Sequence, residues 1–508
     1  MEEEKILEKY SLIVNNVRAD IEIISTTKDY VPIYFLRMPV LEKGTLALLQ
    51  EIREKLISIL QIKISELMDP KAYEELKERF FKKAIKLIKK ELPNLSEPKM
   101  KTLAGLLLHE MLGLGKIEIL LADGNLEEVV VNGSKEPVWV YHKKYGWLKT
   151  NITIPSETQI QNYAASIARR VGRQITTLDP LLDAHLVTGD RVNATLFPIS
   201  ATGNTLTIRM FRRKPWTITD LIENKTVSLE VAALVWLAVQ YEMSMIVSGG
   251  TASGKTSFLS AIMPFIPPNH RVISIEDTRE INLPKFLHWV PLVTREPNPE
   301  GLGEVTMLDL LVNSLRMRPD RIIVAEIRRQ RQAEVLFEAM HTGHSVYATL
   351  HADTVEQTYR RLVNPPINVP ETLLEALDMI VTMFRDRRTG RRRVYEVAEL
   401  VPATGKTGLT IRILYKWDPR KDQIVKFQES FRLMKKLEMH TGMTQKEIQK
   451  DLQDKQKILA WMVKHKVNTV DAVGKIVAEY YRNPKTILEA VEKDEKPEKL
   501  IPKELLEG

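Results

Sequence analysis

The amino-acid sequence predicts an α/β protein whose centre is a doubly wound, mostly parallel sheet. Between residues 229 and 430, short β-branched runs alternate with helical stretches, as in strands joined by crossover helices. Apolar residues recur at helical spacing towards both ends of the chain. With 508 residues, the chain is also too long for a single core. We therefore expect an N-terminal helical segment, an α+β domain, the α/β domain and a C-terminal helical tail.

Residues 1–93 are expected to form a helical segment after a short polar start. Residues 47–68 carry leucine and isoleucine at helical spacing. Asp69 and Pro70 supply an N-cap and a first-turn proline for a second helix that ends near Leu92. This second helix is basic near its C-terminal end, at Lys82, Lys83, Lys86, Lys89 and Lys90. The lysines form either a solvated face that complements the helix dipole, or a docking face for a membrane partner or anionic lipid.

Residues 94–215 are expected to form an α+β domain around a small sheet, and residues 216–228 a polar linker that serves as a hinge. The pattern predicts strands over 126–133, 138–141, 191–197 and 206–211 and a helix over 160–171. An Asn-Gly turn at 132–133 makes the first two strands a hairpin.

The segment 229–430 is the expected α/β domain, and 431–508 the helical tail. Its predicted strands lie at 243–247, 272–275, 321–325 and 345–350, with a basic hairpin over 381–400 at the far edge of the sheet. In the tail, Thr444 and Glu447 form a capping box. Further helices are expected over 470–481 and 485–493.

Residues 249–256 match the phosphate-binding pattern G-x-x-x-x-G-K-[ST] between a strand and a helix. A strand, a glycine loop and a helix N-terminus direct backbone N–H groups at one point, which suits a polyphosphate. Lys255 is expected to reach the β- and γ-phosphates of ATP, and the Thr256 hydroxyl to bind Mg²⁺. The sequence therefore predicts a P-loop NTPase core. The predicted nucleotide-binding set is Gly249, Gly250, Thr251, Ala252, Ser253, Gly254, Lys255, Thr256 and Ser257.

Two acidic segments follow apolar strands, at the sheet edge where ligands bind in open α/β folds. The strand over 321–325 ends in Glu326, the place of a Walker B acid that acts on Mg²⁺ through water. Residues 275–280 carry three acids, the last of them Glu280. Hydrolysis requires one carboxylate that orients water and another that holds the magnesium shell. Helix capping or simple surface exposure is the structural alternative for these acids.

His344 and His351 bracket the strand over 345–350, with Thr349 alongside. This arrangement predicts that the histidines sense the γ-phosphate or couple it to a neighbouring subunit. A structural hydrogen-bonding role is the alternative.

Four segments occur in one order: GGTASGKT at 249–256, IEDTRE at 275–280, IIVAEIR at 322–328 and GHSVYATLHADT at 343–354. They resemble the Walker A, Asp box, Walker B and His box of the secretion ATPase superfamily, the RecA-like hexameric motors of type II and type IV secretion, type IV pili and archaella. The upstream segments EEVVVNG, GDRVNA and TIRMF resemble the N-terminal domain of that family.

The resemblance implies a role for individual residues. Lys255 and Thr256 contact phosphate and Mg²⁺, Glu280 is the catalytic glutamate, and Glu326 is the Walker B acid. The other implied site residues are the His-box pair His344 and His351 and the γ-phosphate arginines Arg191 and Arg209, with Arg213 as a weaker candidate. An arginine supplied by a moving domain stabilises transition-state charge and couples hydrolysis to motion.

The same resemblance implies a homohexamer that acts on a polytopic membrane platform protein at the cytoplasmic face of the membrane. The chain contains no cysteine, so it lacks the four-cysteine zinc module usual in the bacterial assembly and type II members. The helical ends resemble archaeal members instead. The archaellum motor is the first choice, and an archaeal type IV pilus assembly or type II secretion ATPase is the alternative.

Composition limits the other functions. Absence of cysteine excludes disulfides and thiolate metal sites and favours a reducing cytoplasm. The acidic N-terminus is unlike a secretory signal, and no apolar run is long enough to span a bilayer. The net charge of +8 is compatible with a nucleic acid, a membrane surface or an acidic partner.

Two other functions were weighed from the residues. A DNA motor would use the arginines of the hairpin as phosphate contacts, namely Arg387, Arg388, Arg391, Arg392 and Arg393. Because these arginines have no interleaved aromatic residues in the sequence, specific binding of nucleic acid is not expected. A non-catalytic nucleotide-binding scaffold is disfavoured by the presence of both Glu280 and Glu326.

Overall fold

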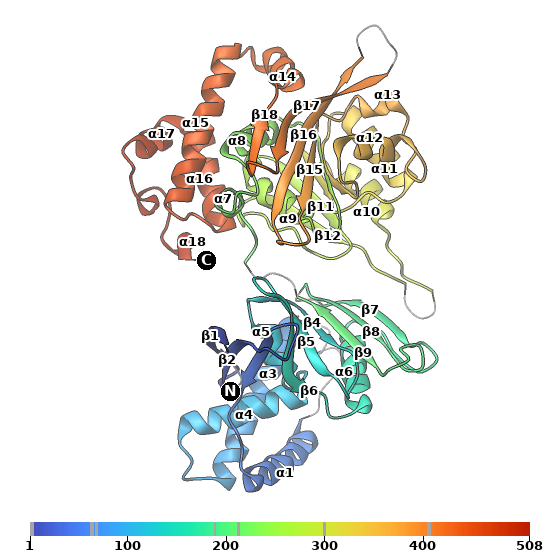
Figure 1. Ribbon diagram of the computed structural model, residues 1–508, viewed down its shortest axis with the longest axis vertical. Coiled ribbons are helices and arrows are strands. Elements are labelled where there is room, and N and C mark those ends of the chain that lie inside the picture. Colours follow the sequence, from blue (N-terminus) through green and yellow to red (C-terminus); the bar gives the residue numbers. More distant parts are fainter. Residues whose placement is uncertain are drawn as a thin grey trace. The chain divides into compact units, whose positions relative to one another are not determined.

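The computed structural model describes residues 5–60, 66, 70–186, 189–210, 214–297, 301–403 and 408–507. The chain divides into two compact units, Met1–Arg213 and Lys214–Gly508 (Figure 1). Each unit contains one nine-stranded sheet. The division falls beside residue 215, where the sequence analysis ended the α+β domain. The predicted segments 1–93 and 94–215 are not separate, because their strands share one sheet.

The sheet of unit 1 has the strand order β1-β2-β3-β6-β5-β4-β9-β8-β7. Only β3 and β6 pair in parallel; every other neighbouring pair is antiparallel. The strands are β1 (Lys5–Val14), β2 (Val17–Ser25), β3 (Ile33–Arg37), β4 (Leu126–Val131), β5 (Pro137–His142), β6 (Gly146–Thr153), β7 (Leu181–His185), β8 (Arg191–Thr195) and β9 (Thr205–Arg209). The predicted hairpin of β4 and β5 and the strand pair β8 and β9 are confirmed.

The prediction of a helical segment over residues 1–93 is wrong for residues 5–37, which form β1, β2 and β3. In β2, Val17, Ala19, Ile21 and Ile23 are all fully buried and occupy every second position. This period of two, with β-branched residues predominating, is the pattern of a strand with one buried face. The helical spacing on which the prediction depended begins only at residue 47.

Helices α1 (Lys43–Ile59) and α3 (Pro70–Glu91) confirm the helical part of the prediction, whereas α4 (Glu97–Met111) lies beyond residue 93 and was not predicted. They pack around a small core of their own, which includes Ile52, Phe80 and Leu107. Two further helices, α5 (Ile117–Ala122) and α6 (Glu157–Arg170), pack on the sheet. The predicted N-cap Asp69 lies outside the described residues.

The sheet of unit 2 has the strand order β12-β11-β13-β14-β10-β15-β16-β17-β18. The strands from β12 to β15 are parallel to one another, and β16, β17 and β18 continue the sheet antiparallel. The strands are β10 (Met245–Gly249), β11 (Arg271–Glu276), β12 (His288–Val293), β13 (Arg321–Val324), β14 (Ser345–Leu350), β15 (Met379–Arg385), β16 (Arg392–Pro402), β17 (Leu409–Asp418) and β18 (Gln423–Lys426). The predicted basic hairpin is β15 and β16, but it is not at the far edge, because β17 and β18 extend beyond it.

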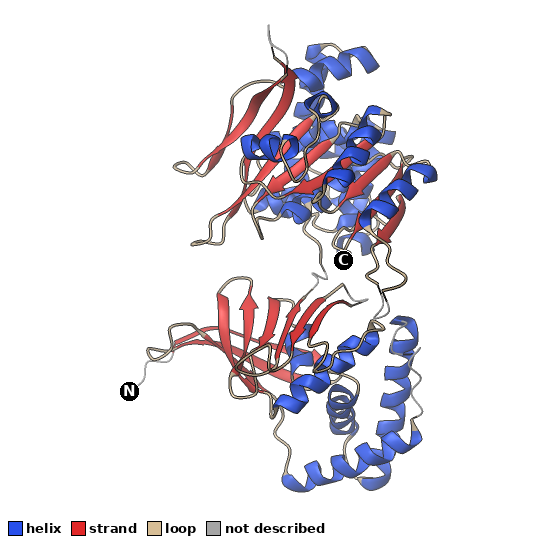
Figure 2. Ribbon diagram, turned by 90° about the vertical axis from the view of Figure 1, so that its right-hand side faces the viewer, coloured by secondary structure: helices blue, strands red, loops and turns tan. Residues whose placement is uncertain are grey.

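Helices cover both faces of this sheet, which confirms the doubly wound α/β fold (Figure 2). One face carries α8 (Leu229–Gln240), α9 (Lys255–Ile262), α15 (Gln445–Lys464) and α16 (Val470–Arg482). The other carries α10 (Met307–Ser314), α11 (Gln330–His341), α12 (Val355–Val363) and α13 (Glu371–Leu374). Along β10, Met245 and Val247 enter the first core and Ile246 the second, as alternation in a strand requires.

Residues 216–228 are not the polar linker that the sequence analysis predicted. They contain α7 (Ile218–Glu223), whose N-terminus is closed by a capping box between Thr217 and Asp220. Ile218 and Leu221 are buried in the same core as α8 and α15. The helix forms because the capping residues satisfy its first N–H groups while its apolar face finds a partner.

The C-terminal helices are part of unit 2. They are α14 (Phe431–Thr441), α15, α16, α17 (Pro484–Glu492) and α18 (Glu504–Glu507), and the predicted capping box of Thr444 and Glu447 begins α15. Trp236 on α8 stacks on Phe265, and its Nε1–H donates to the Tyr481 hydroxyl at 2.8 Å. The predicted helical tail is therefore helical but packs into the core.

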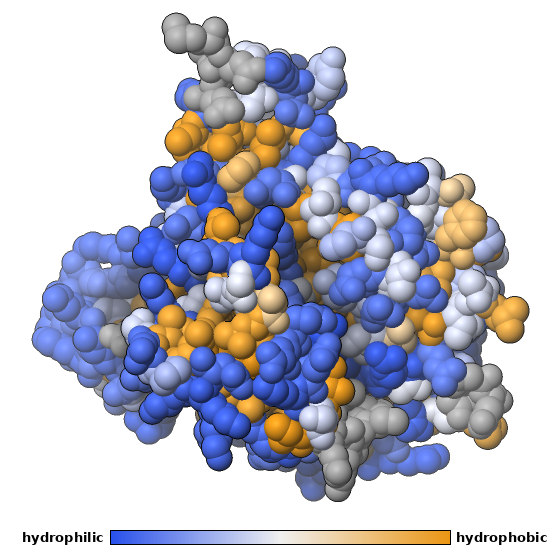
Figure 3. Space-filling view, turned by 90° about the horizontal axis from the view of Figure 1, so that it is seen from below, coloured by the Kyte–Doolittle hydropathy of each residue, from blue (hydrophilic) through white to orange (hydrophobic). Residues whose placement is uncertain are grey.

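No helix among the described residues is long and apolar enough to cross a membrane. The face drawn in Figure 3 is mostly hydrophilic, with apolar residues gathered in separate patches.

Candidate functional site

The phosphate-binding motif forms the predicted strand, loop and helix. β10 ends at Gly249, and α9 begins at Lys255. A Cβ on Gly249 would lie 2.5 Å from both the Met383 carbonyl oxygen and the Ser253 hydroxyl, and the residue has φ +154°. Gly254 has φ +93°. Glycine is required at both positions because of this close approach and the left-handed backbone.

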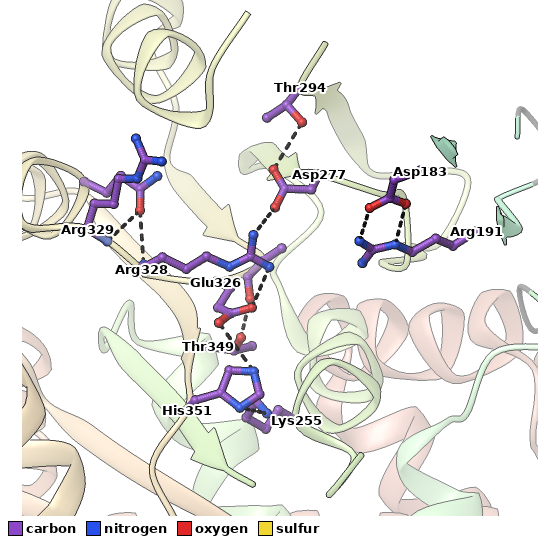
Figure 4. Close-up of polar contacts among 12 residues, drawn as sticks. Asp183, Arg191, Lys255, Asp277, Thr294, Glu326, Arg328, Arg329, Thr349 and His351 are labelled. Atoms are coloured by element: carbon purple, nitrogen blue, oxygen red, sulfur yellow. Dashed lines mark hydrogen bonds and ion pairs between the residues drawn. The ribbon is translucent and has the colours of Figure 1, made fainter. Parts of the chain in front are cut away.

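Lys255 connects the phosphate-binding loop to a chain of polar contacts that leads to Glu326 (Figure 4). Its Nζ donates to the Gly250 carbonyl oxygen at 3.0 Å and lies 3.3 Å from Nδ1 of His351. On the far side of the imidazole, Nε2 lies 3.4 Å from Oε1 of Glu326. The structure thus brings together three residues that the sequence analysis selected separately.

These contacts assign the tautomer of His351. An ammonium has no lone pair, so Nδ1 accepts from Lys255 and Nε2 carries the proton that faces Glu326. Burial lowers the pKa of His351, and the positive charge of Lys255 lowers it further. Burial also lowers the pKa of Lys255, opposed by the charges of Glu326, Asp353 and Glu280. His351 is therefore neutral and connects a cation to an anion.

Glu326 has a second partner, the cationic Arg328, whose Nη2 lies 2.9 Å from Oε2. Nη1 of the same guanidinium donates to Asp277 at 2.9 Å, and Asp277 accepts from the Thr294 hydroxyl at 3.1 Å. Arg328 joins the Walker B segment to the acidic segment after β11. It lies at the end of a motif quoted in the sequence analysis but was not selected there.

The acidic segment is held by Glu276, which is fully buried at the end of β11. One carboxylate oxygen accepts the backbone N–H groups of Glu280 and Ile281 at 2.8 and 2.9 Å. Burial raises the pKa of Glu276 to about 7. Glu280 itself is exposed, and its charge acts on Lys255. Glu276 therefore fixes the turn that presents Glu280. This role is visible only from its burial and hydrogen bonds in the structure.

His344 does not share this site. It precedes β14, whereas His351 follows it, so the length of the strand, about 20 Å, separates them. Its Nδ1 lies 3.2 Å from the Ala339 carbonyl oxygen and 3.1 Å from the Thr342 hydroxyl. His344 lines a different cavity, of 820 Å³, at the amino-terminal edge of the sheet. Of the two predicted histidines, His351 is therefore the one that lies beside the phosphate-binding loop.

Arg191 and Arg209 lie directly opposite each other on β8 and β9 of unit 1, and both are exposed. Arg191 makes a two-pronged ion pair with Asp183, at 3.1 and 2.6 Å. Glu128 on β4 is the cross-strand neighbour of Arg209. Burial raises the pKa of Glu128, and the charge of Arg209 opposes this. Arg213 lies outside the described residues.

The loop fits a nucleoside polyphosphate with Mg²⁺. The Ser253 hydroxyl is buried in the loop and has no hydrogen-bond partner within the described chain. Lys255 begins the helix at whose N-terminus an anion is stabilised. Thr256 and Glu326 supply oxygen ligands of the kind that Mg²⁺ prefers.

Comparison with known proteins agrees with this geometry. Residues 114–386 match the model of the family described as type II/IV secretion system protein. The chain belongs to the type II/IV secretion system protein family. The match runs from unit 1 through β15 and includes the phosphate loop, Glu280, Glu326 and His351.

Proteins similar to this chain come from archaea and bacteria. MJ0900 of Methanocaldococcus jannaschii is 37% identical over 383 residues, which cover 74% of this chain and 69% of that protein. The type IV secretion system protein PtlH of Bordetella pertussis is 29% identical over 314 residues, 54% of this chain and 91% of that protein. Among solved structures, the VirB11 ATPase of the Brucella suis type IV secretion system is 26% identical, with a TM-score of 0.29, over 56% of this chain and 92% of that chain.

Proposed function

We propose that this family member is a Mg²⁺-dependent ATPase that works as a mechanical motor. The observation that carries the proposal is the contact chain Lys255–His351–Glu326 at the N-terminus of α9. It places a cation for phosphate, a neutral imidazole and a carboxylate around one phosphate-binding loop. Glu280, presented by the turn that Glu276 holds, supplies a further carboxylate to orient the attacking water.

The residues of the chain divide the work. Lys255 and the loop N–H groups bind phosphate, and Glu280 positions water for attack. His351 reports the charge near Lys255 to Glu326, since it touches both. Bound Mg²⁺, held through Thr256 and Glu326, would neutralise the charge that develops on the phosphate oxygens.

The proposal is tested by measuring ATP hydrolysis of the purified full chain with Mg²⁺. Lys255→Ala is expected to abolish turnover. The matched control is Lys285→Ala, because this lysine is 92% exposed. Turnover retained in Lys255→Ala, together with a control that is unaffected, would remove the assignment.

We further propose that Arg191 and Arg209 supply charge to the γ-phosphate when the two units close, in this chain or between neighbouring chains of a homohexamer. Their side-by-side position on β8 and β9 supports a joint action on one anion. Arg191→Ala and Arg209→Ala should lower kcat more than they weaken ATP binding. Loss of binding alone would contradict this role. Sedimentation of the chain with a non-hydrolysable ATP analogue tests the hexamer.

The machine that such a motor serves is proposed from the family alone. We propose a filament or secretion machine at the cytoplasmic face of the membrane, acting through a polytopic platform protein. An archaellum is the first candidate, and an archaeal type IV pilus or type II secretion system is the alternative. Deletion of the gene should remove one surface structure and spare the others, and electron microscopy of the cells identifies which. The basic helix α3 is a candidate for peripheral contact with lipid.

A second candidate, a DNA-translocating motor, gains support from one observation. In the sequence, no aromatic residues are interleaved with the hairpin arginines, but neighbouring strands bring aromatic residues together beside the hairpin. Phe384 stacks on Trp417, with ring centroids 5.4 Å apart, and lies 6.0 Å from Tyr395. Partly exposed aromatics beside arginines suit stacked bases. Strong, salt-dependent DNA binding that stimulates hydrolysis would favour this candidate over the filament motor.

A further inference from the structure

Arg392, the first residue of β16, is not part of the phosphate-binding loop but contacts its backbone. Its Nε–H donates to the carbonyl oxygen of Ala252 at 3.0 Å, across 140 residues of sequence. Its Cδ would lie 3.3 Å from a Cβ placed on Gly254. The arginine side chain therefore lies along the loop backbone, and the absence of a side chain at Gly254 gives it room.

Ala252 is the residue of the loop that needs such support. Its φ is +57°, in the left-handed region. For a residue with a Cβ, this conformation costs about 1 kcal/mol. A hydrogen bond from a guanidinium to the Ala252 carbonyl is charge-assisted and of sufficient strength to offset that cost.

The orientation of this carbonyl determines the orientation of the neighbouring donor. The peptide bond is planar and trans, so an outward Ala252 carbonyl turns the Ser253 N–H inward. Ser253 N–H and Lys255 Nζ both meet the Gly250 carbonyl oxygen, at 3.3 and 3.0 Å. Both donors thus point into the loop, where a phosphate oxygen would replace the Gly250 carbonyl oxygen as their acceptor.

We propose that Arg392 is a positioning residue of the nucleotide site, which holds the phosphate loop in its binding conformation from the same chain. This role rests on the proposed ATPase function and is separate from that of Arg191 and Arg209 in unit 1. The arginine is itself held in place, because the next residue, Arg393, is buried and pairs with Asp422 at 2.7 Å. Arg391 on the other side is exposed and serves as the matched control.

The test compares ATP kinetics of the full-length variants at fixed Mg²⁺. Arg392→Ala should raise the KM and the Kd for ATP about ten-fold, the size expected from one charge-assisted hydrogen bond, and leave kcat nearly unchanged. Arg392→Lys should fall between wild type and Arg392→Ala, since a lysine keeps the charge without the fixed geometry. Arg391→Ala should match wild type. Thermal unfolding without nucleotide establishes that each variant is folded.

A rescue variant separates positioning from direct catalysis. Glycine adopts the left-handed conformation without the steric cost. Adding Ala252→Gly to Arg392→Ala should therefore recover much of the lost ATP affinity. An unchanged KM in Arg392→Ala, a fall in kcat alone, or no recovery in the double variant overturns the inference. These outcomes leave the proposed function intact, whereas a wild-type chain that neither binds nor hydrolyses ATP removes the proposed function itself.

Discussion

The two edges of the parallel sheet in unit 2 each bury a cation, but in different surroundings. At the carboxyl-terminal edge, the charges of Glu326, Asp353 and Glu280 act on Lys255. Among the described residues, its amino group contacts only the His351 imidazole and the Gly250 carbonyl oxygen. Its charge is thus balanced by acids that stand apart from it. This arrangement favours the binding of an anion beside Lys255.

At the amino-terminal edge, Arg321 is completely buried at the start of β13. Its guanidinium donates to His270 Nδ1 at 3.1 Å and to the Ser345 and Tyr347 hydroxyls at 2.9 Å each. These partners are uncharged and take up the donors of Nε and Nη1, so the arginine is a fixed part of the core. The comparison indicates that the cation at the carboxyl-terminal edge is available to a ligand, whereas the cation at the amino-terminal edge stabilises the fold. Open α/β sheets bind ligands at the carboxyl-terminal edge.

Replacing the two cations should give opposite results. Lys255→Ala is expected to lower ATP turnover by about a thousand-fold or more, because it removes charge directed at the transferred phosphate. Its free energy of unfolding should stay close to that of wild type. A steady-state ATPase assay and urea unfolding on the same preparation measure both. A clear loss of stability in Lys255→Ala would contradict the comparison, because Lys255 would then stabilise the fold as Arg321 does.

Arg321→Met should lower the free energy of unfolding by about 4 kcal/mol, since buried hydroxyls and an imidazole lose their partner. The folded fraction should keep the wild-type KM for ATP. Arg316→Met is the control, because Arg316 is exposed. If Arg321→Met instead raised the KM for ATP with little loss of stability, the amino-terminal edge would belong to the site.

Glu276→Gln tests a buried acid at the functional edge. The folded state raises the pKa of Glu276 from 4.5 to about 7. Its contribution to stability is therefore greatest below pH 4.5 and falls as the pH rises towards 7, by about 3 kcal/mol in all.

Glutamine still accepts the N–H groups of Glu280 and Ile281 but does not ionise. The variant should therefore lose this fall, and urea unfolding from pH 4.5 to 8 measures the difference. Glu280→Gln is the comparison, expected to lose hydrolysis but to keep most of the fall in stability, because burial raises the pKa of Glu276 more than the charge of Glu280 does. A Glu276→Gln profile parallel to that of wild type would show that Glu276 does not carry the proton.

The smallest expected effect distinguishes the two histidines that flank β14. His351→Asn should lower kcat for ATP by about ten-fold, because it removes the imidazole that connects Lys255 to Glu326. His344→Asn should leave kcat within about two-fold of wild type, since His344 lies at the other edge. Equal losses in the two variants would mean that both ends of the strand communicate with the nucleotide.

The sequence by itself determined the local parts of this protein. A complete phosphate motif, strands that end shortly before Glu326 and Glu280, and the capping box of Thr444 each depend on residues close together in the chain. The period-two pattern of residues 17–23 is equally local, but these residues were assigned to a helical segment in place of a strand. Residues 216–228 were misjudged because their burial depends on α8 and α15.

Only the tertiary structure decided which of these parts meet. It joined Lys255 to His351, Arg392 to Ala252 and Arg328 to Asp277, and it placed His344 at the opposite edge. The strand order β12-β11-β13-β14-β10-β15 is not the order in the chain. Local spacing fixes the direction of a side chain within its own element, but contacts between elements follow from how the sheet is assembled, which depends on the packing of both cores at once.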